Sequence, residues 1–348
     1  MTATLTAARR RSDTLDEQIA RDASRFRILT GDRPTGPLHV GHYFGTLQNR
    51  VRLQDMGAEL FVLVADYQVL TDRDSAEHLG DYVTGMVLDY LAIGVSPGRS
   101  VIFAHSAVPA LNQLLLPFLS LVTVPELQRN PTVKDEIAHS RQSSVSGLMF
   151  TYPAHQAADI LFCKANLVPV GQDQLPHLEL TRVIARRFNR RYAGVFPVPD
   201  ALLSQAPLLL GVDGTKMSKS RGNAIALAAS ADETTRLIRG AKTDAERHVS
   251  YDPERRPEVS NLVLQAALAL GRGPQDVAAS IGTGGAAVLK DTVATAVNEL
   301  LAPVRARRAE YARDLGYVRQ VLREGNERAE AIAAATLDEV RAVMRMRY

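Results

Sequence analysis

Two histidines flank a glycine in the HVGH motif at residues 39–42, shortly after an apolar segment. The sequence predicts a buried strand over 26–30, a loop rich in glycine and proline, and a helix that begins near His39. A helix start offers unpaired N–H groups and the positive end of the helix dipole, so it favours a phosphate group. We expect His39 and His42 to donate to phosphate oxygens, and Gly41 to leave room for a sugar or purine ring.

A second basic motif, KMSKS, occupies residues 216–220, shortly after Asp213-Gly214. Asp-Gly favours a tight turn, so Lys216 and Lys219 are expected on an exposed and mobile loop. Two ammonium groups can close over a leaving pyrophosphate, where their effect is greatest while the charge develops. The segment is not a Walker loop, because the pattern Gly-x4-Gly-Lys-[Ser/Thr] is absent.

The order of these motifs, and the separation of about 175 residues between them, resemble class I aminoacyl-tRNA synthetases. Three further segments resemble tryptophanyl-tRNA synthetases in particular. Residues 151–161 are similar to the amino-acid pocket segment, 168–174 to the ribose-binding loop, and 251–262 to part of the helical domain. The similarity extends from about residue 27 to near the C-terminus, and it is closest to a divergent bacterial branch that resembles the second, auxiliary form.

The resemblance implies a set of site residues. For catalysis it implies phosphate-stabilising roles for His39, His42, Lys134, Lys216 and Lys219. For ATP binding it implies Arg33, Pro34, Thr35, Gly41, His42, Gly171, Gln172, Asp173, Leu208, Lys216, Met217, Ser218, Lys219 and Ser220. For tryptophan binding it implies Gln68, Tyr152, Gln156, Asp159 and Gln174. Asp173 is expected on the ribose hydroxyls and Leu208 near the adenine, whereas Asp159 would accept the indole N–H in an otherwise apolar pocket.

The chain departs from this family at three places. Many bacterial members have glutamine at the position of Arg33, histidine at that of Gln68 and methionine at that of Gln156. Gln156 is similar to the Tyr-Pro-x-x-Gln pattern of tyrosyl enzymes, and the carboxylate of Asp159 could also accept a phenol O–H. Tyrosine–tRNA ligase therefore stays an alternative, as does a synthetase-like binding protein that has lost aminoacylation. The intact phosphate motifs favour an enzyme, and the 168–174 loop favours tryptophan.

The resemblance implies a two-step reaction. The carboxylate of L-tryptophan attacks the α-phosphate of ATP with Mg²⁺, and tryptophanyl-adenylate and pyrophosphate form. A hydroxyl of the terminal ribose of tRNA(Trp) then attacks the activated acyl group. No protein nucleophile is needed, because positioning and charge stabilisation supply most of the rate. The resemblance also implies a homodimer in the cytoplasm.

The elements that position these residues alternate along the chain. Further strands are predicted over 60–65 and 101–104, and the helix between them is capped by Ser75 and ended by Gly94. This alternation predicts an α/β fold with a doubly wound parallel sheet, Rossmann-like, whose ligands lie at the carboxyl ends of the strands. The chain becomes Ala-rich after about residue 225, which predicts an all-α domain with a last helix near 336–348.

We therefore expect a flexible extension over 1–25, a catalytic domain over 26–225 and a helical anticodon-binding domain over 226–348. The length of 348 residues is typical of about two domains, and the composition of 46% hydrophobic and 23% charged residues is that of a globular protein. No apolar run predicts a membrane span. The single cysteine, Cys163, gives no internal disulfide and no metal cluster, and the pI near 9.0 permits nucleic-acid binding.

Overall fold

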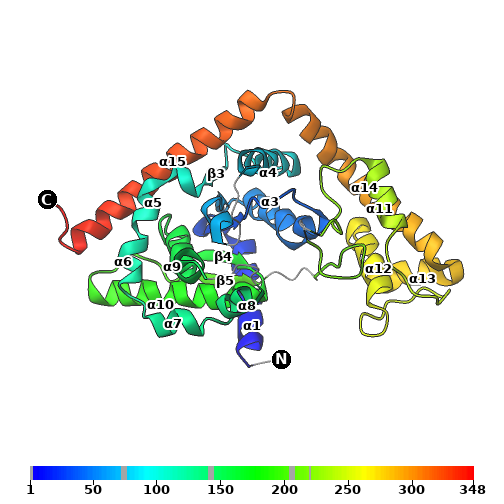
Figure 1. Cartoon of the computed structure of the whole chain (residues 1–348), viewed down its shortest axis with the longest axis horizontal. Helices are drawn as coiled ribbons and strands as arrows, with labels where there is room; N and C mark the ends of the chain where they lie inside the picture. The colour runs from blue at the N-terminus through cyan, green and yellow to red at the C-terminus, as the bar shows by residue number, and fades with distance from the viewer. Residues whose placement is uncertain (1–2, 72–76, 140–144, 204–207, 219–220) are drawn as a thin grey trace.

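The computed structural model describes residues 3–71, 77–139, 145–203, 208–218 and 221–348. An α/β lobe with a parallel sheet lies beside a smaller helical lobe, and two long helices meet above both as an inverted V (Figure 1). The strands are β1 Arg27–Asp32, β2 Glu59–Val64, β3 Ser100–Ala104, β4 Leu167–Val170 and β5 Asp200–Leu203. The helices of the α/β lobe are α1 Ala3–Arg21, α2 Val40–His42, α3 Gln48–Asp55, α4 Leu79–Ile93, α5 Pro109–Gln113, α6 Leu115–Leu119, α7 Val124–Arg129, α8 Pro131–His139, α9 Gly147–Leu161 and α10 Leu175–Arg191. The remaining helices are α11 Ala231–Arg239, α12 Pro257–Leu270, α13 Pro274–Ile281, α14 Gly285–Tyr311 and α15 Leu315–Val343.

The five strands pair in the order β3-β2-β1-β4-β5, and all four pairings are parallel. Alternate residues of the strands belong to two different apolar clusters, one on each face: Leu60 and Val62 to the first, Phe61 and Leu63 to the second. Sheets that are buried on both faces have such continuous apolar strands. The predicted doubly wound sheet is confirmed, and the strand order reverses between β1 and β4.

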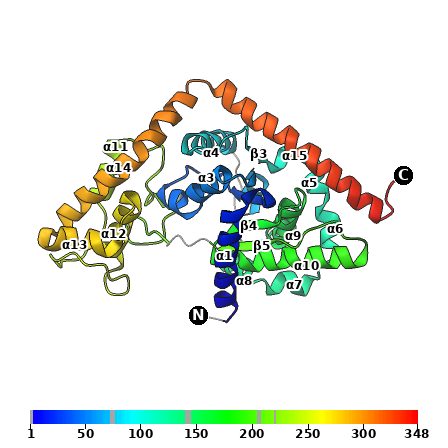
Figure 2. The same ribbon diagram turned by 180° about the vertical axis from the view of Figure 1, so that it is seen from behind.

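The first helix corrects the prediction of a flexible extension over 1–25. Helix α1 packs against β5 at one edge of the sheet, and Leu15 and Ile19 are almost fully buried (Figure 2). Ser12 Oγ accepts the backbone N–H of Leu203 at 2.8 Å. An apolar stripe and an edge strand with an unpaired N–H explain why this segment is held in place.

The predicted helical region after residue 225 is confirmed, because no strand occurs among its described residues. The last helix is much longer than predicted, since α15 begins at Leu315. The helical part also shares an apolar cluster with one face of the sheet. Arg308 on α14 is 2.7 Å from the buried Asp89 on α4. The domain boundary at 225/226 stays a prediction. No helix in the described part of the chain is long and apolar enough to cross a membrane.

Helix α15 covers the other edge of the sheet. The side chain of Asn326 accepts the backbone N–H of Ala104 at 2.9 Å, and Glu330 accepts that of Ala110 at 3.1 Å. Directly before Asn326 the helix backbone touches the strand: a Cβ added at Gly325 would lie 1.8 Å from the carbonyl oxygen of Ile102. Only glycine allows this approach, so Gly325 fixes how closely the helix lies on β3.

Replacing Gly325 with alanine is expected to destabilise the protein by about 3 kcal/mol, because the helix must move away from β3 and weaken both side-chain hydrogen bonds. Urea unfolding followed by circular dichroism measures this free energy. The matched control is Gly80→Ala on α4, where an added Cβ meets nothing within 4 Å, and which is expected to leave stability unchanged or raise it slightly. Equal stabilities of the two variants would contradict the prediction.

Candidate active site

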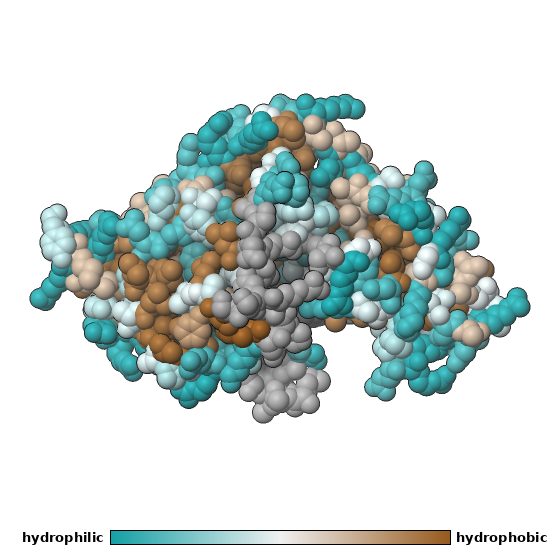
Figure 3. Space-filling view, viewed as in Figure 1, coloured by the Kyte–Doolittle hydropathy of each residue, from teal (hydrophilic) through white to brown (hydrophobic). Residues whose placement is uncertain are grey.

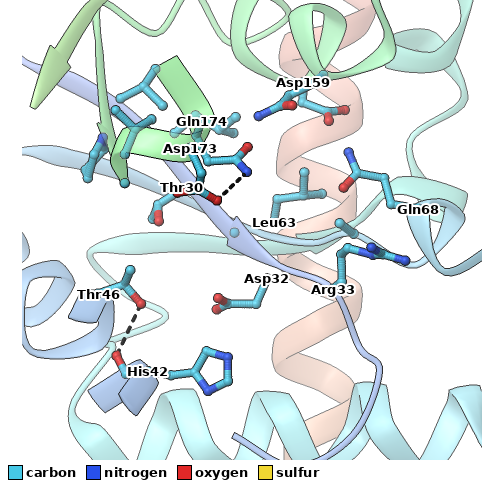
Figure 4. Close-up of a pocket in the computed structure, with 18 of the residues that line it drawn as sticks. Thr30, Asp32, Arg33, His42, Thr46, Leu63, Gln68, Asp159, Asp173 and Gln174 are labelled. Carbon is cyan, nitrogen blue, oxygen red and sulfur yellow. Dashed lines mark hydrogen bonds between the residues drawn. The ribbon is translucent and has the colours of Figure 1, made fainter. Parts of the chain in front are cut away.

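The carboxyl ends of β1 and β4 border a cavity of about 560 Å³, within the range of roughly 300–1,000 Å³ that is usual for small-molecule sites. Figure 4 shows His42 on one side of it, Asp159 on the opposite side and Asp32 between them. The lining residues that the sequence predicted are Arg33, Thr35, His39, His42, Gln68, Tyr152, Gln156, Asp159, Gly171, Asp173, Gln174, Met217 and Ser218. The structure therefore brings most of the predicted residues to one place.

Six predicted residues do not line the cavity: Pro34, Gly41, Lys134, Gln172, Leu208 and Lys216. Lys134 on α8 and Lys216 are exposed, and Leu208 is 69% exposed. Lys219 and Ser220 lie outside the described residues. Phosphate-binding roles for Lys134 and Lys216 stay predictions, and they require these side chains to approach a bound nucleotide.

The helix start at the HVGH motif is confirmed, because α2 begins directly after His39. His42 Nδ1 lies 3.2 Å from the backbone nitrogen of His39 and accepts its N–H. The proton of a neutral His42 ring is therefore on Nε2, which makes Nε2 a donor. A π-helical turn over Tyr43–Leu47 separates α2 from α3. Such turns are frequent at functional sites.

Short backbone contacts join the HVGH region to the segment that follows KMSKS. Val40 donates its N–H to the carbonyl oxygen of Ile225, and Leu227 donates to Leu38, both at 2.9 Å. At Gly41 an added Cβ would lie 3.0 Å from the ring of His39 and 3.2 Å from Met217 Sδ. Gly41 thus allows the KMSKS segment to pack on HVGH. The predicted approach of a sugar or purine to Gly41 stays a prediction.

A buried amide that the sequence analysis missed shapes the KMSKS segment. Asn223 is 2% exposed, and its Oδ1 accepts the backbone N–H of Ser218 at 2.9 Å. Its Nδ2 donates to Asp213 and to the carbonyl oxygen of Lys216. The predicted turn after Asp213 is therefore held from inside, while Lys216 points into solvent.

An ion pair between the two ends of the cavity was also missed. Arg50 on α3 is buried, and it contacts Asp32 Oδ2 at 2.5 Å and Thr30 Oγ1 at 2.9 Å. Tyr90 donates its hydroxyl to the same carboxylate at 2.7 Å. Burial alone would raise the pKa of Asp32, but the Arg50 charge and these hydrogen bonds hold that pKa well below its usual range. Asp32 therefore stays ionised on the cavity wall.

At the amino-acid end, Asp159 on α9 is 1% exposed. Its Oδ1 is 2.8 Å from His105 Nε2, whereas Oδ2 has no hydrogen-bond partner. An unpaired buried carboxylate oxygen is suited to an N–H or O–H donor of a ligand. The prediction that this pocket is otherwise apolar is wrong, because His105 and His155 pack together beside Asp159 with ring centroids 4.7 Å apart.

Tyr152, which was predicted to contact the amino acid, is held by another buried histidine, His177. Asn130 Oδ1 accepts the N–H of Thr132, so its Nδ2 donates to His177 Nδ1 at 3.3 Å. His177 Nε2 then carries the ring proton and donates to the Tyr152 hydroxyl oxygen at 2.9 Å. Burial lowers the pKa of His177 to about 4, so the ring is neutral at pH 7.

The polar residues at the carboxyl ends of the strands are a signal that could have identified some of the missed site residues. Asp32 ends β1, Asp66 follows β2, and His105 follows β3. In a parallel sheet these positions meet at the ligand-binding edge. Asp32 and His105 belong to no motif, so the sequence analysis assigned neither of them to the site.

Comparison with known proteins shows the family to which this chain belongs. Residues 21–302 match the family model described as tRNA synthetases class I (W and Y). A tryptophan–tRNA ligase of Treponema pallidum is 43% identical over 91% of this chain and 96% of its own length. One of Streptococcus agalactiae is 41% identical over 92% of this chain and 98% of its own length. The chain belongs to the tryptophanyl-tRNA synthetases. The predicted family and enzyme class are confirmed.

Solved structures of tryptophanyl-tRNA synthetases are similar to this chain over most of its length. The Campylobacter jejuni synthetase in complex with ADP and tryptophan is 28% identical, with a TM-score of 0.80 over 92% of this chain and 99% of its own. The Mycoplasma pneumoniae synthetase is 26% identical, with a TM-score of 0.78 over 92% and 97%. A tyrosyl-tRNA synthetase of Archaeoglobus fulgidus, at 24% identity, shares the fold. The tyrosine alternative therefore loses support to tryptophan.

The lowered pKa of His177 predicts a pH-dependent stability. Between the usual histidine pKa near 6.5 and the folded value of about 4, the unfolded chain binds a proton that the folded chain excludes. Stability is therefore lost as the pH falls through this window, and it is unaffected above it. From pH 7 to 4.5 the wild type is expected to lose about 2 kcal/mol more than His177→Gln, which lacks the titrating ring. Urea unfolding at both pH values measures the difference, and equal losses would show that His177 is not the cause.

Proposed function

We propose that this synthetase forms tryptophanyl-adenylate from L-tryptophan and ATP in the cavity and transfers the tryptophanyl group to tRNA(Trp). The observation that supports this most directly is the unpaired Oδ2 of Asp159. It lies at one end of a cavity whose other end is bordered by the HVGH and KMSKS segments. The related synthetase of C. jejuni binds ADP and tryptophan together, which fits a cavity with two such ends.

In this proposal, Asp159 accepts the indole N–H, and Tyr152, Gln156, Gln68 and Gln174 surround the amino acid. The nucleotide, with Mg²⁺ bound to its phosphates, lies along Arg33, Thr35, Gly171 and Asp173. Its phosphates face the Nε2–H of His42. The tryptophan carboxylate attacks the α-phosphate, pyrophosphate leaves, and His39, His42, Lys134, Lys216 and Lys219 stabilise the growing charge. The ion pair between Asp32 and Arg50 keeps the cavity wall at the end of β1 rigid.

The helical part of the chain after residue 225 is proposed to hold the tRNA anticodon. It carries exposed arginines between α14 and α15 and on the first turns of α15, which offer cations to phosphates: Arg313, Arg319 and Arg323. A basic contact of this kind makes tRNA affinity fall as salt rises. The single buried Cys163 suits a reducing compartment, which supports the cytoplasm as the place of action.

A homodimer is proposed through the face around α6 and α7. Leu116 is 74% exposed and Val124 58% exposed, and Figure 3 shows an apolar patch over this part of the α/β lobe. Exposed apolar patches of this kind mark interaction surfaces. Sedimentation velocity at micromolar protein concentration would detect the dimer.

An ATP–pyrophosphate exchange assay with each of the twenty amino acids tests the reaction and its substrate. Exchange is expected with tryptophan alone, because the relatives that this chain matches over most of its length are tryptophan–tRNA ligases. Exchange with tyrosine but not tryptophan would overturn the substrate. Absence of exchange with every amino acid would favour a binding protein without aminoacylation activity.

Removing the carboxylate in Asp159→Ala is expected to lower kcat/KM for tryptophan about 100-fold, because a hydrogen bond to a charged acceptor is lost. The KM for ATP should change little, since the nucleotide lies at the other end of the cavity. The isosteric Asp159→Asn keeps the shape and a neutral acceptor, so its loss should be smaller. An equal rise in both KM values would show instead that Asp159 only supports the fold.

A further inference from the structure

Three side chains of metal-ligating types are buried together behind the amino-acid end of the cavity. They are His105, which follows β3, and His155 and Asp159 on α9, with exposed fractions of 0, 4 and 1%. One nitrogen from each imidazole and one carboxylate oxygen lie within 4.8 Å of one another. The sequence analysis expected no metal cluster, and no spacing motif connects His105 to the other two residues.

The protonation of His155 follows from its neighbour. Asn112 Nδ2 donates to the carbonyl oxygens of His105 and Val108, which assigns its Oδ1 as an acceptor. His155 Nε2 lies 2.7 Å from that oxygen and must donate to it. The other nitrogen, Nδ1, then presents a lone pair, and it is buried without a hydrogen-bond partner. A histidine that is fixed through one nitrogen by a second residue is the usual form of a metal ligand.

The other two residues of the cluster also have a buried atom that lacks a hydrogen-bond partner. His105 Nδ1 and Asp159 Oδ2 are also buried without a hydrogen-bond partner. The Oδ1 of Asp66 adds a second negative charge 4.0 Å from His105 Nδ1, and this same oxygen accepts the N–H groups of Tyr67 and Ser106. Unpaired buried acceptors cost free energy. An indole N–H could pair only with Asp159 Oδ2, whereas a cation could be bound by one nitrogen of each ring together with the carboxylate.

We propose that His105, His155 and Asp159 form a binding site for a divalent cation of the Zn²⁺ class, and that this cation competes with tryptophan. Two imidazoles and one carboxylate are typical ligands of Zn²⁺ and Co²⁺, which tolerate four-coordinate geometry with an open fourth position. Mg²⁺ and Ca²⁺ prefer oxygen ligands and are not expected here. Asp159 also lines the cavity, so the fourth position is accessible from the amino-acid end.

Competition follows from the shared oxygen, and it rests on the proposed role of Asp159 as the indole acceptor. An Asp159 oxygen whose charge is drawn to a divalent cation is a poor acceptor for an N–H. Conversely, a bound indole covers the approach to that oxygen. The site would therefore make adenylate formation sensitive to free zinc.

Titration of the metal-free protein with Co²⁺ tests the site without any reaction. Tetrahedral Co²⁺ absorbs visible light, so the wild type is expected to develop a saturable d–d band that Zn²⁺ abolishes. His155→Leu removes one ligand and should lose the band, and His155→Gln does the same if the first variant folds poorly. The matched control His248→Leu removes an exposed histidine and should keep the band. No band in the wild type, or a band that persists without His155, would overturn the site.

Tryptophan fluorescence tests the competition. The chain contains no Trp residue, so added tryptophan is the only indole fluorophore, and the assay needs no ATP that would chelate zinc. At about ten times its dissociation constant, Zn²⁺ should weaken tryptophan binding about 11-fold in the wild type, but less than about 2-fold in His155→Gln. Equal tryptophan affinity with and without Zn²⁺ would overturn the competition. Failure to bind tryptophan even without zinc would count against the proposed function instead.

Discussion

The buried ion pair between Asp32 and Arg50 is the interaction on which the arrangement of the site depends. It joins the end of β1 to α3, and through the Tyr90 hydroxyl it joins both to α4. Helix α3 continues from the HVGH segment, so the same pair fixes the phosphate motif relative to the sheet. Removing one member of such a pair leaves an uncompensated buried charge, which typically costs 3–5 kcal/mol. The Asp32–Arg50 ion pair, at the centre of the site, thus holds β1, α3 and α4 in place.

The two ends of the cavity, on either side of Asp32, differ in their hydrogen-bonding groups. Towards HVGH, the ring of His42 offers a donor, its Nε2–H. Towards α9, the groups are acceptors or neutral rings: Asp159, His105 and His155. A nucleotide and an amino acid that carry opposite hydrogen-bonding needs can therefore lie end to end without exchanging places. Under the proposed function, this polarity would orient the two substrates together with the shape of the cavity.

Much of the fold was predictable from the sequence, because local patterns specify it. Apolar runs gave the first three strands, and Gly94 ends α4 as expected. The two phosphate motifs located one end of the site. The other end was only partly predictable: Asp159 was found through family resemblance, but its contact with His105 joins residues 54 positions apart. Arg50 was missed for the same reason, since its partner Asp32 is on another element. Helix α1 was misjudged because a stripe as short as Leu15 and Ile19 becomes significant only when an edge strand lies beside it.

Helices from opposite ends of the chain lie along the two edges of the sheet, α1 on β5 and α15 on β3. Each supplies side-chain acceptors for backbone N–H groups near its edge of the sheet. Unpaired strand edges are templates for association with other chains. The sheet therefore depends on both of these helices to protect its edges. A fragment trimmed at either end would leave a strand edge uncovered, and it would be prone to polymerise rather than to remain an isolated enzyme.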